Sequence, residues 1–247
     1  MDLDKNIAFR WNGSEIEVID TIEKIEESDL LFLDRQKQLS KRNIENFIED
    51  KPFLNMFFWG PRGVGKSSLV KLLLNLYKQR NLRVIECSQE YIEGIYKIYR
   101  FVRTNNKYYF IVYFDDISFD NSDISFRRFK SIMEGGLEEK PINLLYIATS
   151  NKRHIVKETM KPKDDVYSND LENEQLSLFA RFGLSITFPL LTRREYITVV
   201  RYYLDKYLVN LDNLEEKAEN FATNRGGRSA RVAKQFAIYS HLVNDDL

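Results

Sequence analysis

Short apolar runs alternate with amphipathic stretches along most of the chain, up to Pro189. The apolar runs have the length and residue types of β-strands, and they lie at 55–59, 82–87, 108–114, 143–149 and 184–188. Helices are predicted before or between them, at 34–49, 67–79 and 124–134. Because the third run is apolar throughout, we expect it to be a central strand covered on both faces. This alternation predicts an α/β domain with a parallel sheet.

The pattern changes after Pro189, where the sequence offers no further strand candidate. Thr192 and Glu195 have the spacing of a capping box that opens a helix, and two more helical stretches follow near 213–223 and 229–243. We therefore expect three parts, which are an N-terminal arm at 1–30, an α/β domain at 31–189 and a small helical lid at 190–247. The arm is expected to be irregular or strand-like through residues 7–11.

Composition and charge place limits on location and partners. Lys and Arg number 37, as do Asp and Glu, so the net charge of zero gives no overall attraction to nucleic acid or an anionic membrane, although a local patch stays possible. The single cysteine, Cys87, excludes an internal disulfide and suits a reducing compartment. We recognise no signal peptide and no apolar run of the ~20 residues that span a bilayer. A soluble, cytoplasmic protein without a membrane partner is expected.

The clearest motif is Gly60-x-x-x-x-Gly65-Lys66-Ser67, which has every fixed position of a P-loop and lies between a predicted strand and a predicted helix. Glycines let the backbone wrap around phosphate with its N–H groups inward, and the helix start adds a positive dipole end. Lys66 would contact the β- and γ-phosphates, and the Ser67 hydroxyl would bind Mg²⁺. The whole predicted nucleotide-binding segment is Gly60, Pro61, Arg62, Gly63, Val64, Gly65, Lys66, Ser67 and Ser68, although Ser68 could instead pack or cap the helix.

Two adjacent acids, Asp115 and Asp116, follow the apolar run at 108–114. Carboxylates are poor choices beside a buried strand unless a cation lies near them. We therefore assign Asp115 to the Mg²⁺ shell, through water, and Asp116 to orienting or activating the attacking water. A solvated pair at a strand end is the alternative, and Asp120 is a second candidate for the catalytic acid.

Three further polar residues are candidates for contacts near the γ-phosphate. Asn151 ends the fourth predicted strand, where it can reach both water and phosphate. Thr149 and Ser150 are weaker options, and Ser-Asn also suits a simple turn. Arg181 precedes the fifth strand, where either an arginine finger toward a neighbouring subunit or a surface ion pair fits the spacing. In the lid, Arg231 is our choice for a contact with the nucleotide and Arg228 is the reserve, with a solvated helix terminus as the alternative.

Taken together, these motifs resemble the AAA+ class of P-loop ATPases. More narrowly, the chain is similar to a bacterial family of unknown function described as predicted AAA+ ATPases. The segments that carry this similarity are 33–37, 59–71, 114–119, 133–138, 148–154, 176–178, 181–184 and 227–231. Relatives commonly have Gly-Ile where this chain has Phe32-Leu33, and Asp where it has Ala180.

The resemblance implies a P-loop NTPase fold of the AAA+ type, with a parallel five-stranded sheet in the order 5-1-4-3-2 and a C-terminal α-helical lid. It implies ATP with Mg²⁺, and it places adenine between the Leu33 region and the lid. It also implies a first sensor at Asn151, a finger at Arg181 and a second sensor at Arg231. The resemblance further implies that subunits form a ring, or that hydrolysis depends on a neighbouring subunit. We therefore expect a homo-oligomer.

Three functions compete. The first is an ATPase that remodels or loads an unknown macromolecular client, and the second is a slowly hydrolysing, ATP-dependent switch that recruits a partner such as a helicase or DNA. The shorter Asp116, where many related ATPases have Glu, and the absence of an evident extra client domain keep the second function open. A small-molecule kinase is the third, but no insertion that would bind an acceptor is evident.

Overall fold

The computed structural model describes residues 1–118, 124–134, 137–151 and 181–244. Its described strands form one seven-stranded sheet in the order β2-β1-β4-β5-β6-β3-β7. The strands are β1 (Ala8–Trp11), β2 (Ile16–Val18), β3 (Met56–Trp59), β4 (Leu82–Cys87), β5 (Tyr109–Phe114), β6 (Leu144–Ser150) and β7 (Leu184–Thr187). All neighbouring pairs are parallel except β1 with β2, so the sheet is of the parallel type.

The prediction of five strands is corrected by β1 and β2, which extend the sheet beyond β4. In β1, Phe9 and Trp11 are 0% and 2% exposed, while Arg10 between them faces outward and pairs with Glu86 of β4. Burial of alternate side chains therefore makes this part of the N-terminal arm a strand of the sheet. The five strands predicted from the sequence lie in the order β7-β3-β6-β5-β4 within the larger sheet.

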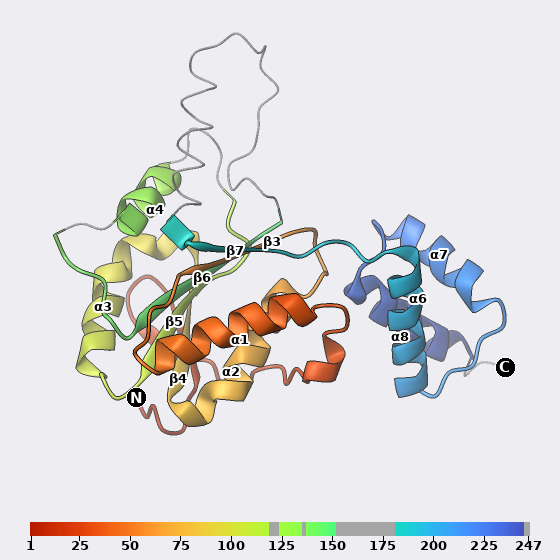
Figure 1. The fold of residues 1–247 in the computed structure, drawn as a ribbon, viewed down its shortest axis with the longest axis horizontal. Helices are drawn as coiled ribbons and strands as arrows, with labels where there is room; N and C mark the ends of the chain where they lie inside the picture. Colours follow the sequence, from red (N-terminus) through yellow and green to blue (C-terminus); the bar gives the residue numbers. More distant parts are fainter. Residues whose placement is uncertain (119–123, 135–136, 152–180, 245–247) are drawn as a thin grey trace, which may run out of the picture.

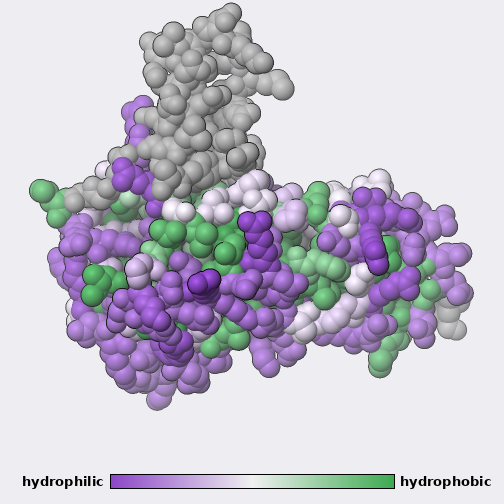
Figure 2. Space-filling view, viewed as in Figure 1, coloured by the Kyte–Doolittle hydropathy of each residue, from purple (hydrophilic) through white to green (hydrophobic). Residues whose placement is uncertain are grey.

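Helices cover both faces of the sheet (Figure 1). The helices α1 (Asp34–Ile48) and α2 (Lys66–Tyr77) pack on one face, and α3 (Ile95–Thr104) and α4 (Ile124–Glu134) pack on the other. Successive residues of β5 alternate between the two cores, with Ile111 in the first and Val112 in the second. This explains why the run is apolar throughout, as expected of a central strand. In the view of Figure 2, the outer surface of the face that carries α1 is mainly hydrophilic.

Short 3₁₀ segments complete the described elements, namely η1 (Glu27–Asp29), η2 (Lys78–Arg80) and η3 (Gln89–Gly94). The segment η3 and helix α3 were not predicted from the sequence. Within the described residues, no helix is long and apolar enough to cross a bilayer.

Three helices after β7 form a separate small bundle beside the sheet (Figure 1). They are α6 (Arg193–Lys206), α7 (Leu214–Asn224) and α8 (Ala230–Asn244). They share a core of their own that includes Tyr196, Val200 and Ala233, each 0% exposed. The predicted capping box is confirmed, because Glu195 N donates to Thr192 Oγ1 at 3.3 Å and Thr192 N donates to Glu195 Oε2 at 2.8 Å. We call this bundle the lid.

The register of the sheet brings the predicted site residues together. Trp59 lies opposite Ser150, and Phe114 lies opposite Ala148. The carboxyl ends of β3, β5 and β6 are therefore neighbours, as in other parallel α/β sheets that bind ligands at this edge.

Candidate functional site

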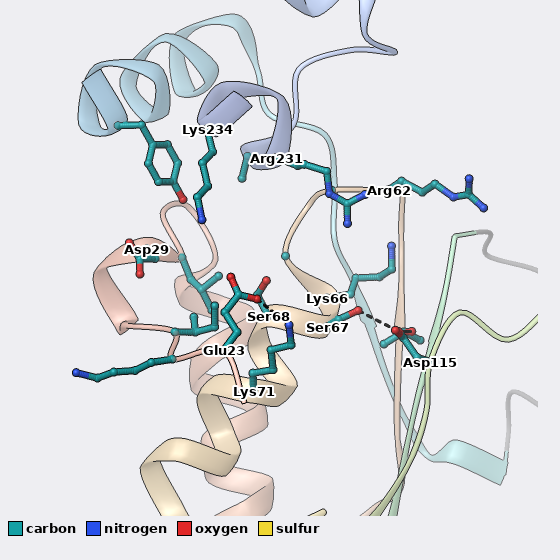
Figure 3. A pocket seen from close by; sticks show the side chains of 18 of the residues that line it. Glu23, Asp29, Arg62, Lys66, Ser67, Ser68, Lys71, Asp115, Arg231 and Lys234 are labelled. Carbon is teal, nitrogen blue, oxygen red and sulfur yellow. Dashed lines mark hydrogen bonds and ion pairs between the residues drawn. The ribbon is translucent and has the colours of Figure 1, made fainter. Parts of the chain in front are cut away.

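The phosphate loop, residues 60–68, leaves β3 and enters α2 at Lys66 (Figure 3). Gly60 adopts φ 149°, and a Cβ there would lie 2.0 Å from the carbonyl oxygen of Phe188. Gly63 adopts φ 79°, and a Cβ there would lie 2.9 Å from Arg231 Cβ. Only glycine fits these close approaches, and the positive φ angles turn the loop back over the start of α2. The loop therefore has the backbone shape that can wrap around an anion.

Lys66 is 7% exposed, and its ammonium lies inside the loop. It donates to the carbonyl oxygens of Gly60 at 2.6 Å and Pro61 at 2.7 Å, and to Asn151 Oδ1 at 3.1 Å. Burial lowers the pKa of Lys66 to about 8, although the charges of Asp116 and Asp115 oppose this shift. The side chain is thus a cation with a desolvation cost, which a bound anion would offset.

Asp115 accepts hydrogen bonds from three hydroxyl groups. Its Oδ1 accepts hydrogen bonds from Ser67 Oγ at 3.0 Å, Tyr113 OH at 2.5 Å and Thr149 Oγ1 at 2.7 Å (the Ser67 bond is drawn in Figure 3). Burial, followed by the charge of Asp115, raises the pKa of Tyr113, so this phenol stays a donor at neutral pH. Among the described residues, none donates a hydrogen bond to Asp115 Oδ2.

The donor set at Asp115 fits a magnesium ion held jointly with phosphate. The described residues contain no group of three His, Cys, Asp or Glu side chains that could hold a metal by themselves. Mg²⁺ is usually bound by one or two protein oxygens together with water and substrate phosphates. Ser67 and Asp115, which are in contact at the start of α2, provide such a partial shell.

Asp116 has an unusual backbone, with φ 49° in the left-handed region. Its amide donates to Thr149 Oγ1 at 2.8 Å, and its Oδ1 accepts a hydrogen bond from Asn151 Nδ2. Arg62 Nη2 lies 3.6 Å from its Oδ2. The amide of Asn151 therefore links Lys66 to Asp116, since its oxygen accepts from one and its nitrogen donates to the other.

The two lid arginines have different surroundings. Arg228 donates from Nη2 to Glu219 Oε2 at 2.6 Å and from Nε to Glu219 Oε1 at 3.0 Å, so it is paired inside the lid. Arg231 lies on the first turn of α8 and lines the cavity above the phosphate loop (Figure 3). Its backbone N–H donates to Gly63 O at 3.1 Å. Of the two candidates, Arg231 is the one that faces the site.

A cavity of about 510 Å³ lies between the phosphate loop, the lid and residues 23–30. This volume is in the range of ligand pockets, roughly 300–1,000 Å³. Ser68, Asp115, Asp116 and Asn151 all line it.

A smaller cavity of about 40 Å³ adjoins the first and is mainly apolar. It is lined by Leu33, which is 6% exposed, together with Val64, Leu191 and Val199 among others. Phe32 lies in the same wall with φ 60°, a conformation that the glycine of the resembled family would adopt without strain.

Some sequence-based candidates lie elsewhere. Arg181 is exposed, precedes β7 and does not line either cavity, so within this single chain it is apart from the phosphate loop. Asp120 and Ala180 lie outside the described residues.

Several residues that line the cavity were not singled out from the sequence, namely Glu23, Asp29, Lys71, Lys206 and Lys234, nor was Tyr113, which contacts Asp115. One signal was available for Lys71, which follows Ser67 by four positions and therefore lies on the same helix face. No comparable signal marks Glu23, because its position depends on how the N-terminal segment crosses α2.

Comparison with solved structures identifies similar folds. Two variants of RuvB from Thermotoga maritima match with TM-scores of 0.52 and 0.51, at 13% and 14% sequence identity. Each match covers 87% of this chain but only 61% and 62% of the RuvB chains, so this chain spans about six-tenths of their length. At this identity the likeness shows the fold alone. A search of curated proteins returns no match.

The family comparison covers almost the whole chain. Residues 4–243 match the family described as "Protein of unknown function (DUF815)". This match agrees with the resemblance of the sequence to a bacterial family of unknown function. The chain therefore belongs to the DUF815 family and has an α/β fold of the AAA+ P-loop ATPase type.

Proposed function

We propose that this protein binds ATP with Mg²⁺ and hydrolyses it to drive the remodelling or loading of a macromolecular client. The observation that carries the proposal is the 3.0 Å contact between Ser67 Oγ and Asp115 Oδ1 beside the buried ammonium of Lys66. P-loop enzymes use a hydroxyl, a strand-end carboxylate and a lysine in this relationship to hold a triphosphate and its metal.

Each part of the phosphate loop has a role in this proposal. Backbone N–H groups of residues 60–68 and the positive end of α2 hold the phosphates, and Lys66 exchanges loop carbonyls for phosphate oxygens. Ser67 and Asp115, the latter through water, hold Mg²⁺, which when bound neutralises charge on the phosphates. The adenine enters the apolar cavity beside Leu33, whose volume of about 40 Å³ requires the lid to shift.

Asp116 and Asn151 are proposed to act on the attacking water. The hydrogen bond from Asn151 Nδ2 to Asp116 Oδ1 supports this assignment, since it fixes the carboxylate at the edge of the cavity. Asp116 would accept the proton, and Asn151 would contact water and the γ-phosphate. Arg231, which lines the cavity from the lid, would contact the phosphates as a second sensor.

Arg181 is proposed to complete a neighbouring subunit's site in a homo-oligomer. Its exposure and its distance from its own chain's cavity are compatible with an arginine finger that acts between subunits. The test is the ATPase rate per subunit as a function of protein concentration. The proposal expects a rate that rises with concentration and falls by roughly 10³–10⁵ in Arg181→Ala. A rate per subunit that does not depend on concentration or on Arg181 would contradict it.

A second function is a slowly hydrolysing switch that recruits a partner. It is favoured by the short side chain at Asp116, which is already engaged by Asn151 and lies 3.6 Å from Arg62 Nη2. Tight ATP binding with negligible turnover at every concentration would support this function over the first. Phosphorylation of an added metabolite would instead indicate a kinase.

A further inference from the structure

Glu23 is an acidic residue in a cavity rich in cations. The cationic residues that line the cavity are Lys24, Arg62, Lys66, Lys71, Lys206, Arg231 and Lys234. Four acidic residues of the described part of the chain line the cavity, and two of them, Asp115 and Asp116, are already assigned to Mg²⁺ and to the attacking water in the proposed function. A third, Asp29, accepts hydrogen bonds from Lys206 Nζ at 2.7 Å and Tyr202 OH at 3.0 Å on the lid. Glu23 is the acid that these roles leave unexplained.

The position of Glu23 is fixed from two sides. Ile22 and Ile25 pack against the core under α1 and α2, which holds the N-terminal segment in place. Glu23 Oε2 accepts a hydrogen bond from Lys71 Nζ at 2.7 Å, and no donor among the described residues reaches Oε1. Figure 3 shows this pair beside Ser68, with Lys234 directed toward it from the lid. One carboxylate oxygen is therefore anchored and the other is available to a ligand.

Its contact with Lys71 holds Glu23 in the wall of the phosphate cavity, about one turn of α2 beyond Ser67. Lys71 follows Ser67 by four residues on α2, a rise of roughly 6 Å along the helix. The phosphate cavity and the apolar cavity share Asp29, Leu30, Gly65 and Ala230 in their walls. A molecule with phosphates in one and a base in the other must place its sugar at this junction. Glu23 and Leu30 lie on the same N-terminal segment and line the same cavity.

We propose that Glu23 is a specificity-determining residue whose carboxylate accepts a hydrogen bond from a ribose hydroxyl of the bound nucleotide. This inference rests on the proposed function, and it assigns the sugar rather than the phosphates or the base. A carboxylate near a triphosphate repels it, so the acid is disfavoured there unless it receives donors from the ligand. Lys71 offsets this repulsion and orients the carboxylate. Acidic residues read ribose hydroxyls in the same way in dinucleotide-binding folds.

The charge state of Glu23 suits an acceptor. The hydrogen bond from Lys71, opposed by burial and supported by the charges of Lys71 and Lys234, lowers the pKa of the Glu23 carboxyl. The group is therefore ionised at neutral pH, when both of its oxygens can only accept.

The test compares the affinities of the full chain for ATP, 2′-deoxyATP and 3′-deoxyATP in the presence of Mg²⁺. A hydrogen bond to a charged group predicts that wild type binds ATP roughly 10- to 100-fold more tightly than at least one deoxy analogue. Glu23→Ala should bind ATP and that analogue with equal affinity, because it lacks the acceptor that distinguishes them. Glu23→Gln, which keeps an acceptor oxygen, should retain part of the preference.

Asp20→Ala is the matched control, because Asp20 is an exposed acid on the same segment that does not line the cavity. It should keep the full preference for ATP. Equal affinities in wild type, or a preference that survives in Glu23→Ala, would overturn the role of Glu23 while leaving the proposed function in place. Failure of wild type to bind any of the three nucleotides would overturn the proposed function, and the inference with it.

Discussion

The backbone N–H of Arg231 donates to the carbonyl oxygen of Gly63 at 3.1 Å, which joins the first turn of the lid helix α8 to the phosphate loop. The contact is close, because a Cβ on Gly63 would lie 2.9 Å from both Arg231 Cβ and Ser229 Oγ. A change in the loop that moves Gly63 must therefore move the lid or break this hydrogen bond. Through this contact, a change in the conformation of the phosphate loop on nucleotide binding can move the lid.

Gly63→Ala tests this contact. The substitution places a side chain at φ 79°, which costs about 1–2 kcal/mol in the left-handed region, and overpacks the lid, which typically costs about 1–3 kcal/mol more. We expect the free energy of unfolding to fall by both amounts, and the affinity for ATP to fall because the loop is displaced. Urea denaturation and a binding titration measure the two effects.

Gly226→Ala separates backbone strain from the lid contact. Gly226 has a similar φ of 84°, but among the described residues, its two chain neighbours aside, no atom lies within 4 Å of the Cβ that the substitution adds. It should lose only the backbone contribution, about 1–2 kcal/mol, and bind ATP as wild type does. If the two variants lose equal stability and affinity, the contact between Gly63 and the lid has no energetic role.

The pH dependence of ATP binding tests the state of Lys66. Burial lowers its pKa to about 8, so in the free protein the side chain loses its proton as pH rises through 8. A bound triphosphate favours the ammonium form, so binding above this pH must take up a proton, and affinity must fall as pH rises. We therefore expect greater proton uptake per ATP at pH 8.5 than at pH 7.0.

Calorimetry in buffers of different ionisation enthalpy measures this uptake. Burial also lowers the pKa of Lys140 to about 8, but its Nζ donates to Leu144 O at 2.9 Å, at the opposite end of β6 from the site. Lys140 does not line the cavity, so it should contribute no uptake on binding. Equal uptake at both pH values would show that Lys66 does not bind the triphosphate.

Lys66→Ala should abolish the binding of ATP. At an ATP concentration 100 times the dissociation constant, ATP should raise the free energy of unfolding of wild type by roughly 2.7 kcal/mol. This stabilisation should be lost in Lys66→Ala, and its persistence would count against the site.

Features set by local sequence were predictable. The glycine spacing and Lys66 specify the phosphate loop, and the apolar run ending at Phe114 specifies a central strand, because both depend on neighbours in the chain. Strand β1 was predicted only in part, because its apolar pattern covers four residues and includes the charged Arg10. That residue is accommodated by Glu86, which comes from another strand and is 76 positions away.

In the site, too, the contacts set by local sequence were predictable and those between distant segments were not. Ser67 and Asp115 were paired from motif and strand position, and the structure brings them into contact. Thr149 was considered only as a weaker alternative to Asn151, yet it donates to Asp115 and accepts from the amide of Asp116. Those bonds depend on the register between β5 and β6, which the pattern of a single strand does not contain. The position of Glu23 depends in the same way on a long-range contact, because the N-terminal segment packs beside α2.

Asp116→Asn should separate binding from turnover. The amide keeps the volume of the side chain but removes the base, so ATP should still stabilise the protein while hydrolysis falls by roughly 10²–10⁴. Single-turnover hydrolysis and ATP-dependent thermal stabilisation measure the two properties. Unchanged turnover would assign water activation to another residue, for which Asp120 is the sequence-based alternative. Asp115→Asn is the comparison variant and should instead weaken the dependence of binding on Mg²⁺.

The two lid arginines offer a matched pair of substitutions. Arg231→Ala removes a cation that lines the cavity, so ATP affinity or turnover should fall by roughly 10- to 100-fold with little change in melting temperature. Arg228→Ala leaves Glu219 without its hydrogen-bonded partner, so it should lower the melting temperature and leave ATP affinity unchanged. Thermal unfolding and nucleotide titration of both variants test the assignment. A loss of affinity in Arg228→Ala that exceeds the loss in Arg231→Ala would make Arg228 the sensor, because the lid would then have to rotate and exchange Glu219 for phosphate.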